Sequence, residues 1–329
     1  MQQQSIVYMG TPQFAVAPLR ALVEAGMHVA AVVTTPDRPM GRGQRMQPSA
    51  VKLAAMELGI PVLQPERLRD PQFIDQLRAI GPALGIVVAF RMLPESVWAL
   101  PRLGTFNLHA SLLPQYRGAA PINWAIMNGE TQTGVTTFLL DHQIDTGQLL
   151  MQQTVDIGPA DTAGTLHDKL MLAGAPLVVQ TAQQLLAGQA QPRRQTDALP
   201  DGAVLRDAPK IFAPTCALRW ERTVAELHNQ VRGLSPYPAA HTQLRLMRNG
   251  QTHIVPLKVL QAQPCQDRAQ TDVGQVFTDG KRWIRVACAD GLLQIDQLQP
   301  AGKRPMTAEE YLRGMQNAQL LQMGHFDEQ

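Results

Sequence analysis

Through the first half of the chain, short apolar runs of β-forming residues alternate with stretches of helical spacing, and this alternation constrains the fold most strongly. Apolar strands that alternate with amphipathic helices are typical of an open sheet whose strands run mostly parallel, with helices on its faces. The sequence therefore predicts an α/β fold for this part of the chain. The expected strands are 6–9, 28–34, 85–90, 104–109 and 134–140, and the expected helices are 14–25, 71–80 and 164–187.

The character of the chain changes near residue 188. Residues 189–209 are polar, contain proline and lack periodicity, which indicates a linker. Beyond them, one helix near 223–232 is followed by several short β-rich runs. Asn-Gly and Asp-Gly pairs between such runs are typical of tight hairpins, and they occur at 249–250, 279–280 and 290–291. Short strands joined by tight turns predict a small β-barrel, for which an OB-type barrel is one option.

The predicted division of the chain is therefore a domain 1–188, a linker 189–209 and a second domain 210–329. A net charge of +2 over 329 residues is too small to indicate a polyanionic partner by itself. The excess positive charge lies in the C-terminal part, which predicts a mildly basic module beside a neutral one.

Three features of the composition bear on the compartment. The cysteines are widely spaced and lack metal-ligand spacing, so we expect reduced structural thiols and no metal site; they are Cys216, Cys265 and Cys288. No apolar stretch approaches the roughly 20 residues needed to span a bilayer. The first residues do not have the pattern of a signal peptide. We therefore expect a cytoplasmic protein that makes no contact with a membrane.

The segment GTFNLHASLLPQYRG at 104–118 carries the most chemistry. If 104–109 is a strand, Asn107 and His109 lie two residues apart and point to the same face. Open α/β sheets bind ligands at the carboxyl ends of their strands, where this run ends. An amide beside an imidazole suits acyl transfer, because the amide can stabilise an oxyanion and the imidazole can move a proton near neutral pH. The spacing alone also fits an ordinary strand end with hydrated polar side chains.

Two further segments are expected near the same sheet edge. Asp145 follows the strand 134–140 and could orient His109, but Asp141, four residues earlier, is a competing candidate. The glycine-rich stretch 36–45 lacks the spacing of a phosphate-binding loop. Its arginines could contact an anionic ligand such as an RNA backbone, or they could belong to a solvated surface loop; they are Arg38, Arg42 and Arg45.

Together these segments resemble the folate-dependent formyltransferases, and the resemblance covers nearly the whole chain. Its strongest part is NLHASLLPQYRGAAPINWAI at 107–126, with Asp-Thr-Gly at 145–147 downstream. Other matching segments are MGTPQFAVAPLRALVEAG at 9–26, TPDRPMGRG at 35–43, IPVLQPE at 60–66, DTAGTLHDKL at 161–170 and GLLQIDQLQPAGKRPM at 291–306. The resemblance implies a Rossmann-like formyltransferase domain followed by an OB-like domain that binds tRNA.

The resemblance also implies a reaction. The arginine-bearing loop at 35–45 and the C-terminal barrel are similar to those of family members that act on tRNA. The expected reaction is transfer of the formyl group of 10-formyltetrahydrofolate to the α-amino group of methionyl initiator tRNA. The folate is expected as a cosubstrate, with no tightly bound cofactor and no metal. The expected partners are thus the tRNA and the small-molecule folate, and a monomer is expected.

The family's functional residues carry over to named positions. Asn107, His109 and Asp145 match the catalytic residues. The positions that match the folate-contacting residues are Ser111, Leu112, Leu113 and Pro114, together with Phe90, Arg91 and Met92. Arg42 matches the arginine that the family inserts against the tRNA acceptor stem, with Arg38 and Arg45 beside it.

Two departures and three alternatives accompany the resemblance. Arg91 stands where the family usually has glycine, which could change the backbone or the pterin contacts. The Lys-Glu pair that the family usually has near Lys210 is also lost. The alternative functions are formyl transfer to an amino sugar, which would not need the arginine-bearing loop, hydrolysis of the formyl donor by water, and an RNA-binding module without turnover.

Overall fold

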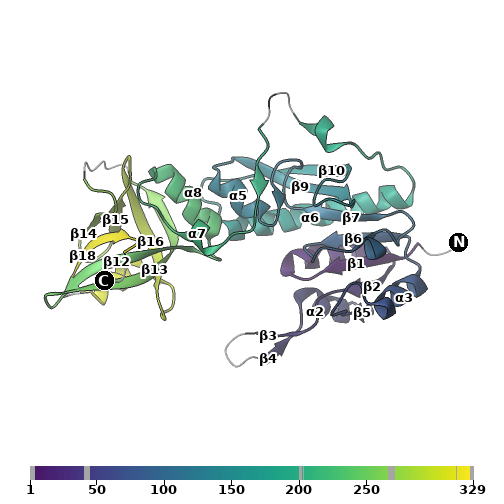
Figure 1. Cartoon of the computed structure of the whole chain (residues 1–329), viewed down its shortest axis with the longest axis horizontal. Helices are drawn as coiled ribbons and strands as arrows, with labels where there is room; N and C mark the ends of the chain where they lie inside the picture. The colour runs from purple at the N-terminus through teal and green to yellow at the C-terminus, as the bar shows by residue number, and fades with distance from the viewer. Residues whose placement is uncertain are drawn as a thin grey trace. The chain divides into compact units, whose positions relative to one another are not determined.

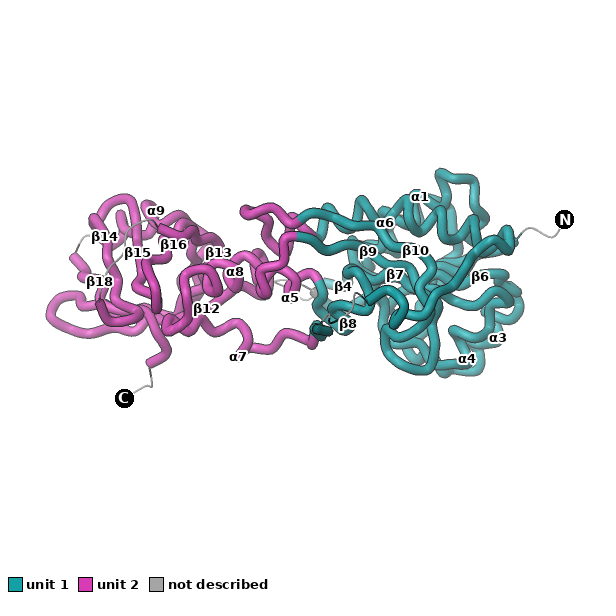
Figure 2. The backbone as a smooth tube through the Cα atoms, turned by 90° about the horizontal axis from the view of Figure 1, so that it is seen from above, with its two compact units in different colours: residues 1–121, 132–156, 167–208 teal, residues 122–131, 157–166, 209–329 magenta. Residues whose placement is uncertain are grey.

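The computed structural model describes residues 4–40, 45–199, 202, 204–265, 271–315 and 317–326. The chain forms two compact units, which Figure 2 colours separately. The first unit contains residues 1–121, 132–156 and 167–208, and the second contains 122–131, 157–166 and 209–329. Two short segments from the N-terminal half of the chain, 122–131 and 157–166, thus belong to the second unit.

A sheet of seven strands forms the centre of the first unit, in the order β10-β9-β7-β6-β1-β2-β5 (Figure 1). The strands from β7 to β5 pair in parallel, and β9 and β10 extend the β7 edge as antiparallel strands. The prediction of a mostly parallel sheet is confirmed. The strands are β1 Ile6–Gly10, β2 Val29–Val33, β5 Val62–Leu63, β6 Leu84–Val88, β7 Thr105–His109, β9 Gln132–Leu139 and β10 Leu149–Asp156.

Helices cover both faces of this sheet. On one face, α3 and α4 pack on Val7 and Met9 of β1 through an apolar cluster. On the other face, α6 lies so close to β7 that a Cβ on Gly174 would be 2.6 Å from the Leu108 side chain. The helices of this part of the chain are η1 Gln13–Ala15, α1 Val16–Glu24, α2 Ala50–Glu57, α3 Pro71–Ile80, α4 Glu95–Trp98, α5 Pro121–Met127 and α6 Ala163–Leu186.

Helix α3 shows how local sequence sets the ends of an element. The Asp70 side chain accepts a 2.9 Å hydrogen bond from the main-chain N–H of Gln72, and Pro71 occupies the first turn, where its missing N–H is not needed. Gly81 ends the helix with a φ of +59°, a conformation that glycine adopts without a steric penalty. These signals explain why the predicted helix 71–80 has the observed bounds.

Short strands and isolated bridges organise the rest of the first unit. Strand β3 (Arg38–Met40) pairs with β4 (Arg45–Gln47), and β8 (Arg117–Gly118) pairs with β11 (Asp207–Ala208).

The described residues of 189–208, in the segment predicted as a linker, belong to the first unit. Arg193 forms an antiparallel bridge with Leu149, and Gln195, which begins the helical turn η2 Gln195–Ala198, is only 4 % exposed. The regular elements of this segment, η2 and β11, are only four and two residues long, so its sequence has no periodicity that would reveal the contact.

The second unit is an antiparallel barrel with strand order β14-β15-β16-β13-β12-β18, and β17 pairs with β16. Gln275, just before β14, bridges Gln322 of β18, so the two edges of the sheet meet and the barrel is nearly closed. The predicted small β-barrel is confirmed. Its strands are β12 Ala240–Arg248, β13 Gln251–Pro264, β14 Val276–Thr278, β15 Ile284–Ala287, β16 Leu292–Pro300, β17 Met306–Thr307 and β18 Ala318–Gly324.

Three helices accompany the barrel: α7 Ala213–Cys216, α8 Val224–Leu234 and α9 Ala308–Arg313. Helix α8 begins with a capping box, in which Thr223 and Glu226 each bond the other's main-chain N–H. Its apolar face packs into the barrel core. The turn between β12 and β13 is Asn249-Gly250, with φ of +51° and +74°, which is the backbone that a two-residue hairpin requires.

Candidate active site

The carboxyl end of β7 lies in the middle of the sheet, between β6 and β9, and it carries Asn107 and His109 (Figure 1). Leu108 packs against α6, so the alternation of side chains puts the other two residues on the opposite face. Asn107 is partly exposed, and within the described part of the chain its side-chain amide has no hydrogen-bond partner. This amide is therefore available to a ligand.

His109 is 8 % exposed, and each of its ring nitrogens has a defined neighbour. Nε2 lies 2.8 Å from the carbonyl oxygen of Tyr116. A carbonyl oxygen can only accept, so Nε2 carries the proton and Nδ1 of the neutral ring has a lone pair. Nδ1 lies 3.8 Å from Oδ2 of Asp145. A proton taken up by His109 therefore arrives on Nδ1, beside a carboxylate.

Asp145 occupies an unusual turn. Its φ of +55° lies in the left-handed region that residues with a Cβ rarely adopt. Its Oδ2 accepts a 3.0 Å hydrogen bond from the main-chain N–H of Gly118. The carbonyl oxygens of Asp145 and Gly147 each accept a 2.8 Å hydrogen bond from Nε2 of Gln195. Gly118 thus holds the carboxylate of Asp145, and Gln195 holds the main chain of its turn.

The competing carboxylate, Asp141, stabilises its own turn. Its Oδ1 accepts hydrogen bonds from the main-chain N–H of Gln143 at 3.0 Å and from the hydroxyl of Thr146 at 2.8 Å. The residue is exposed. Of the two candidates that the sequence left open, the structure brings Asp145 to His109.

The segment 111–114 is mostly buried and is held by hydrogen bonds to Thr136. Ser111 and Leu113 are almost completely buried. The hydroxyl of Thr136 donates to the carbonyl of Ser111 at 2.6 Å and accepts from the N–H of Leu113 at 3.1 Å. Pro114 is buried and Leu112 is partly exposed. Thr136 therefore fixes the loop through the main chain of Ser111 and Leu113, and the side chain of Leu112 lies against Gly134 of β9.

Phe90, Arg91 and Met92 follow β6, the strand beside β7. The guanidinium of Arg91 lies 5.5 Å from the centroid of the Phe90 ring and donates to two main-chain carbonyls, those of Pro65 and Glu66. Burial, and then the positive charge of Arg38, lower the pKa of Arg91. The unusual arginine is thus accommodated by the chain that follows β5. Met92 is exposed.

The arginine-bearing stretch forms a hairpin at its base. Arg38 on β3 pairs with Gln47, and Arg45 on β4 pairs with Met40. Both arginine side chains are exposed. Arg42, the predicted tRNA-contacting arginine, lies outside the described residues.

The base of this hairpin is anchored by Asp37. Its carboxylate accepts from Nζ of Lys52 at 2.7 Å and from the Gln64 amide at 2.8 Å, and these two bonds lower the pKa of Asp37. These contacts fix the position of the chain just before β3, which begins at the exposed Arg38.

Four residues that the sequence did not single out support the site: Tyr116, Gly118, Thr136 and Gln195. Tyr116 and Gly118 lie within the motif quoted above, so the motif contained a signal for them. Gln195 lies in an aperiodic polar stretch, and nothing in the sequence links it to Asp145. The bridge between Arg193 and Leu149 holds the chain beside the Asp145 turn.

Among the described residues, no group of three or more His, Cys, Asp or Glu side chains could hold a metal ion. The helices of the same residues include none with the length and apolar character to cross a bilayer.

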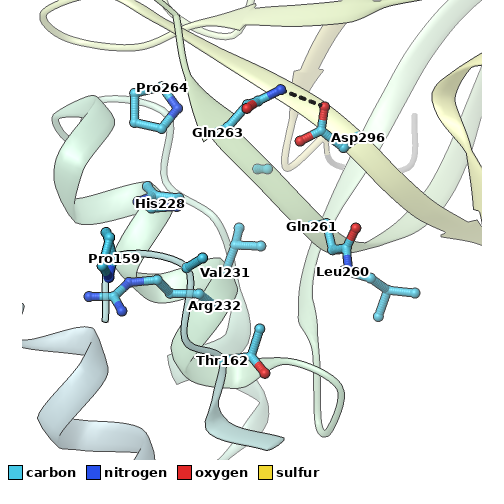
Figure 3. A pocket seen from close by; sticks show the side chains of 12 residues that line it. Pro159, Thr162, His228, Val231, Arg232, Leu260, Gln261, Gln263, Pro264 and Asp296 are labelled. Carbon is cyan, nitrogen blue, oxygen red and sulfur yellow. Dashed lines mark hydrogen bonds between the residues drawn. The ribbon is translucent and has the colours of Figure 1, made fainter. Parts of the chain in front are cut away.

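A cavity of about 440 Å³ lies in the second unit, between α8 and β13 (Figure 3). His228 and Arg232 of α8 and Asp296 of β16 line it, and Asp296 accepts a 3.2 Å hydrogen bond from Gln263. Burial, and then the charge of Arg232, lower the pKa of His228. None of the site residues predicted from the sequence lines this cavity.

The chain is similar to known proteins over most of its length. The formyl transferase family profile matches residues 4–181, and the profile of the formyl transferase C-terminal domain matches residues 210–316. A methionyl-tRNA formyltransferase from Parabacteroides distasonis is 54 % identical over 310 residues, 94 % of this chain and 95 % of the relative. The methionyl-tRNA formyltransferase of Bacteroides thetaiotaomicron is 50 % identical over 309 residues, with the same coverage of both chains.

Among solved structures, a sugar 3N-formyl transferase, WlaRD, studied in the presence of dTDP and 5-N-formyl-THF, has the same fold with a TM-score of 0.64. The match covers 92 % of this chain and 100 % of that one at 19 % identity. A family profile over more than half of the chain and relatives at about half identity over nearly all of it lead to one conclusion: the chain belongs to the formyl transferase family.

Proposed function

We propose that this chain transfers the formyl group of 10-formyltetrahydrofolate to the α-amino group of methionyl initiator tRNA, giving N-formylmethionyl-tRNA for translation initiation. The observation that carries the proposal is the convergence of His109 and Asp145 at the end of β7, with Asn107 on the same strand face. Sequence identities of 54 % and 50 % to methionyl-tRNA formyltransferases support methionyl-tRNA as the acceptor of the formyl group.

The proposed roles follow from the geometry. The α-amine, with a reference pKa near 7.7–8.0, is partly neutral at cellular pH and attacks the formyl carbon. A new C–N bond forms while the carbonyl oxygen becomes an oxyanion. The side-chain amide of Asn107, which has no hydrogen-bond partner within the described residues, donates to this oxyanion.

His109 carries the proton in this scheme. Nδ1 takes a proton from the attacking nitrogen as the tetrahedral intermediate forms. The resulting imidazolium is stabilised by the carboxylate of Asp145, 3.8 Å away. The bond between the formyl carbon and N10 of the folate then breaks, and the same proton goes to N10. The products are the formylated amine and tetrahydrofolate, and the ring returns to its starting state.

Several finer assignments belong to this proposal. Leu112 and the backbone of 111–114, with Phe90, Arg91 and Met92, contact the folate, which is a cosubstrate and not a bound cofactor. Arg42, with Arg38 and Arg45, contacts the tRNA. The functional domains are 1–188 and 210–329, joined by 189–209, and the barrel domain helps to hold the tRNA. The protein acts as a monomer in the cytoplasm.

A formylation assay tests the proposal. Initiator and elongator methionyl-tRNA are each incubated with the protein and 10-formyltetrahydrofolate, and the formylated product is quantified. We expect the initiator to be formylated and the elongator to react far more slowly. Folate turnover without tRNA would indicate hydrolysis instead, and formylation of a dTDP-linked amino sugar in place of the tRNA would overturn the proposed acceptor.

A further inference from the structure

Gln195 uses its whole hydrogen-bonding capacity beneath the turn that carries Asp145. Its Oε1 accepts from Nε of Arg117 at 3.0 Å and from Nη2 of Arg117 at 2.6 Å. Its Nε2 donates to the carbonyls of Asp145 and Gly147, both at 2.8 Å. A glutamine amide has two acceptor lone pairs and two N–H donors, so each of them is occupied.

This arrangement fixes the orientation of the amide. Arginine can only donate hydrogen bonds, and main-chain carbonyls can only accept them. In a flipped amide, the NH₂ group would face the Arg117 guanidinium, and the amide oxygen would face the two carbonyl oxygens. Neither pair could form a hydrogen bond. Gln195 is 4 % exposed, which leaves little room for water to replace a lost bond. The bridge between Arg193 and Leu149, with its two hydrogen bonds of 2.8 and 2.9 Å, holds the chain two residues before Gln195.

The two residues of β8 act on opposite sides of Asp145. The main-chain N–H of Gly118 holds the carboxylate at 3.0 Å. The side chain of Arg117, acting through Gln195, holds the main chain of the same residue. Asp145 has a φ of +55°, which a residue with a Cβ keeps only when its surroundings impose it. The amide of Gln195 is the group that reaches both carbonyls of this turn.

We propose that Gln195 is a positioning residue for the reaction, which keeps the Asp145 carboxylate facing Nδ1 of His109 by bridging Arg117 to the Asp145–Gly147 turn. The inference rests on the proposed function of the same site. It assigns a role in catalysis to the segment that the sequence predicts to be a linker. Gln195 itself touches neither substrate, because it acts through the main chain of Asp145.

The substitution Gln195→Glu removes the donor half of the bridge and adds a negative charge that Arg117 can pair with. A glutamate keeps the volume and can still accept from Arg117, but an ionised carboxylate cannot donate to the two carbonyls. We expect kcat to fall about 10- to 100-fold, the size of effect that a displacement near 1 Å can have. KM for the tRNA and for the folate should change less than threefold.

A matched control exists in the second unit. Gln230 is also buried, at 5 % exposure, and its Nε2 bridges the carbonyls of Thr215 and Ala217 at 2.9 and 3.1 Å. Gln230→Glu removes the same kind of bridge away from the catalytic strand. Since Oε1 of Gln230 has no hydrogen-bond partner within the described residues, this variant should lose at least as much thermal stability as Gln195→Glu, while its kcat stays within twofold of the parent. Equal losses of kcat in both variants would show that Gln195 has only a structural role.

A double-variant cycle separates positioning from general weakening. If Gln195 acts through Asp145, the variant carrying both Gln195→Glu and Asp145→Asn should have the kcat of Asp145→Asn alone, within about threefold. If the fold-losses of kcat in the two single variants multiply in the double variant, the inference is overturned. If Gln195→Glu does not fold, Arg117→Lys replaces it in the cycle, since a lysine can keep one hydrogen bond to Oε1 of Gln195. The loss of kcat should then be smaller, and the double variant should again have the kcat of Asp145→Asn alone.

One readout does not depend on turnover. The ring resonances of His109, followed by NMR in the protein without substrates, should move in the same direction in Gln195→Glu as in Asp145→Asn, and should not move in Gln230→Glu. Unmoved resonances would overturn the inference. If the resonances shift as expected but no tRNA is formylated by the parent protein, the proposed function fails and the positioning contact stands.

Discussion

The main-chain N–H of Gly118 donates a 3.0 Å hydrogen bond to Oδ2 of Asp145, the same oxygen that faces Nδ1 of His109 at 3.8 Å. One carboxylate oxygen therefore links the loop after β7 to the turn before β10. The opposite ring nitrogen of His109 bonds the carbonyl of Tyr116, so this bond orients the imidazole with Nδ1 towards the carboxylate.

Replacing Gly118 tests the contact directly. Its φ is +123°, and a Cβ would lie 2.5 Å from the carbonyl oxygen of Ala208. Gly118→Ala should destabilise the protein by about 1–3 kcal/mol, the usual cost of a strained backbone, and should lower kcat at least tenfold. Gly188→Ala is the control, because Gly188 also has a positive φ, +67°, but open space around it. The control should lose stability and keep its kcat, as measured by thermal unfolding and steady-state kinetics.

Asn107→Ala removes the amide proposed to bind the oxyanion. Loss of one such donor costs about 2.7–4 kcal/mol of barrier, so kcat should fall by about 10²–10³-fold. KM for both substrates should change little, because the oxyanion exists only after the attack. A variant with unchanged turnover and a raised KM would remove Asn107 from this role.

Asp145→Asn keeps the size of the side chain and removes its charge. The imidazolium of His109 would lose its partner, and kcat should fall by about 10²–10⁴-fold, the range that positioned acid–base catalysis contributes. Asp141→Asn is the matched control, since Asp141 bonds only within its own turn among the described residues. Steady-state formylation rates compare the two. Similar kcat losses in both variants would contradict the choice of Asp145.

The thiol of Cys288 provides a prediction about pH. Burial raises the pKa of Cys288 to about 12, and burial also raises the pKa of Cys216. An unfolded cysteine ionises near pH 8.5, so the contribution of Cys288 to stability is complete below that pH and is lost as the pH rises towards 12.

Thiol labelling measures whether burial also keeps reagents away from each cysteine. In the native protein at pH 8, an alkylating reagent should modify the partly exposed Cys265 first, and Cys216 and Cys288 only as fast as the protein unfolds. Mass spectrometry of labelled peptides identifies each site. Labelling of Cys288 at the rate of an exposed thiol would show that its site is open to solvent.

The arrangement of elements was accessible from the sequence because local patterns encode it. Apolar runs that alternate with helical stretches led to the mostly parallel sheet, and Asp70, Pro71 and Gly81 set the ends of α3. Turn pairs such as Asn249-Gly250 led to the hairpins of the barrel. Strand β10 was not predicted, since its side chains are mostly half-buried or exposed and it has no continuous apolar run.

The sequence by itself determined which residue types could act: an amide and an imidazole two residues apart on one strand, followed by two candidate carboxylates. Side-chain alternation is a local property, so the common face of Asn107 and His109 needed no tertiary information. Residue spacing alone left Asp141 and Asp145 open, and the family resemblance pointed to Asp145. The tertiary structure brings Asp145 to His109, because residues far away along the chain hold its turn. The hydrogen bonds from Gly118 and Gln195 join segments 27 and 50 residues distant, and no local pattern encodes such pairings.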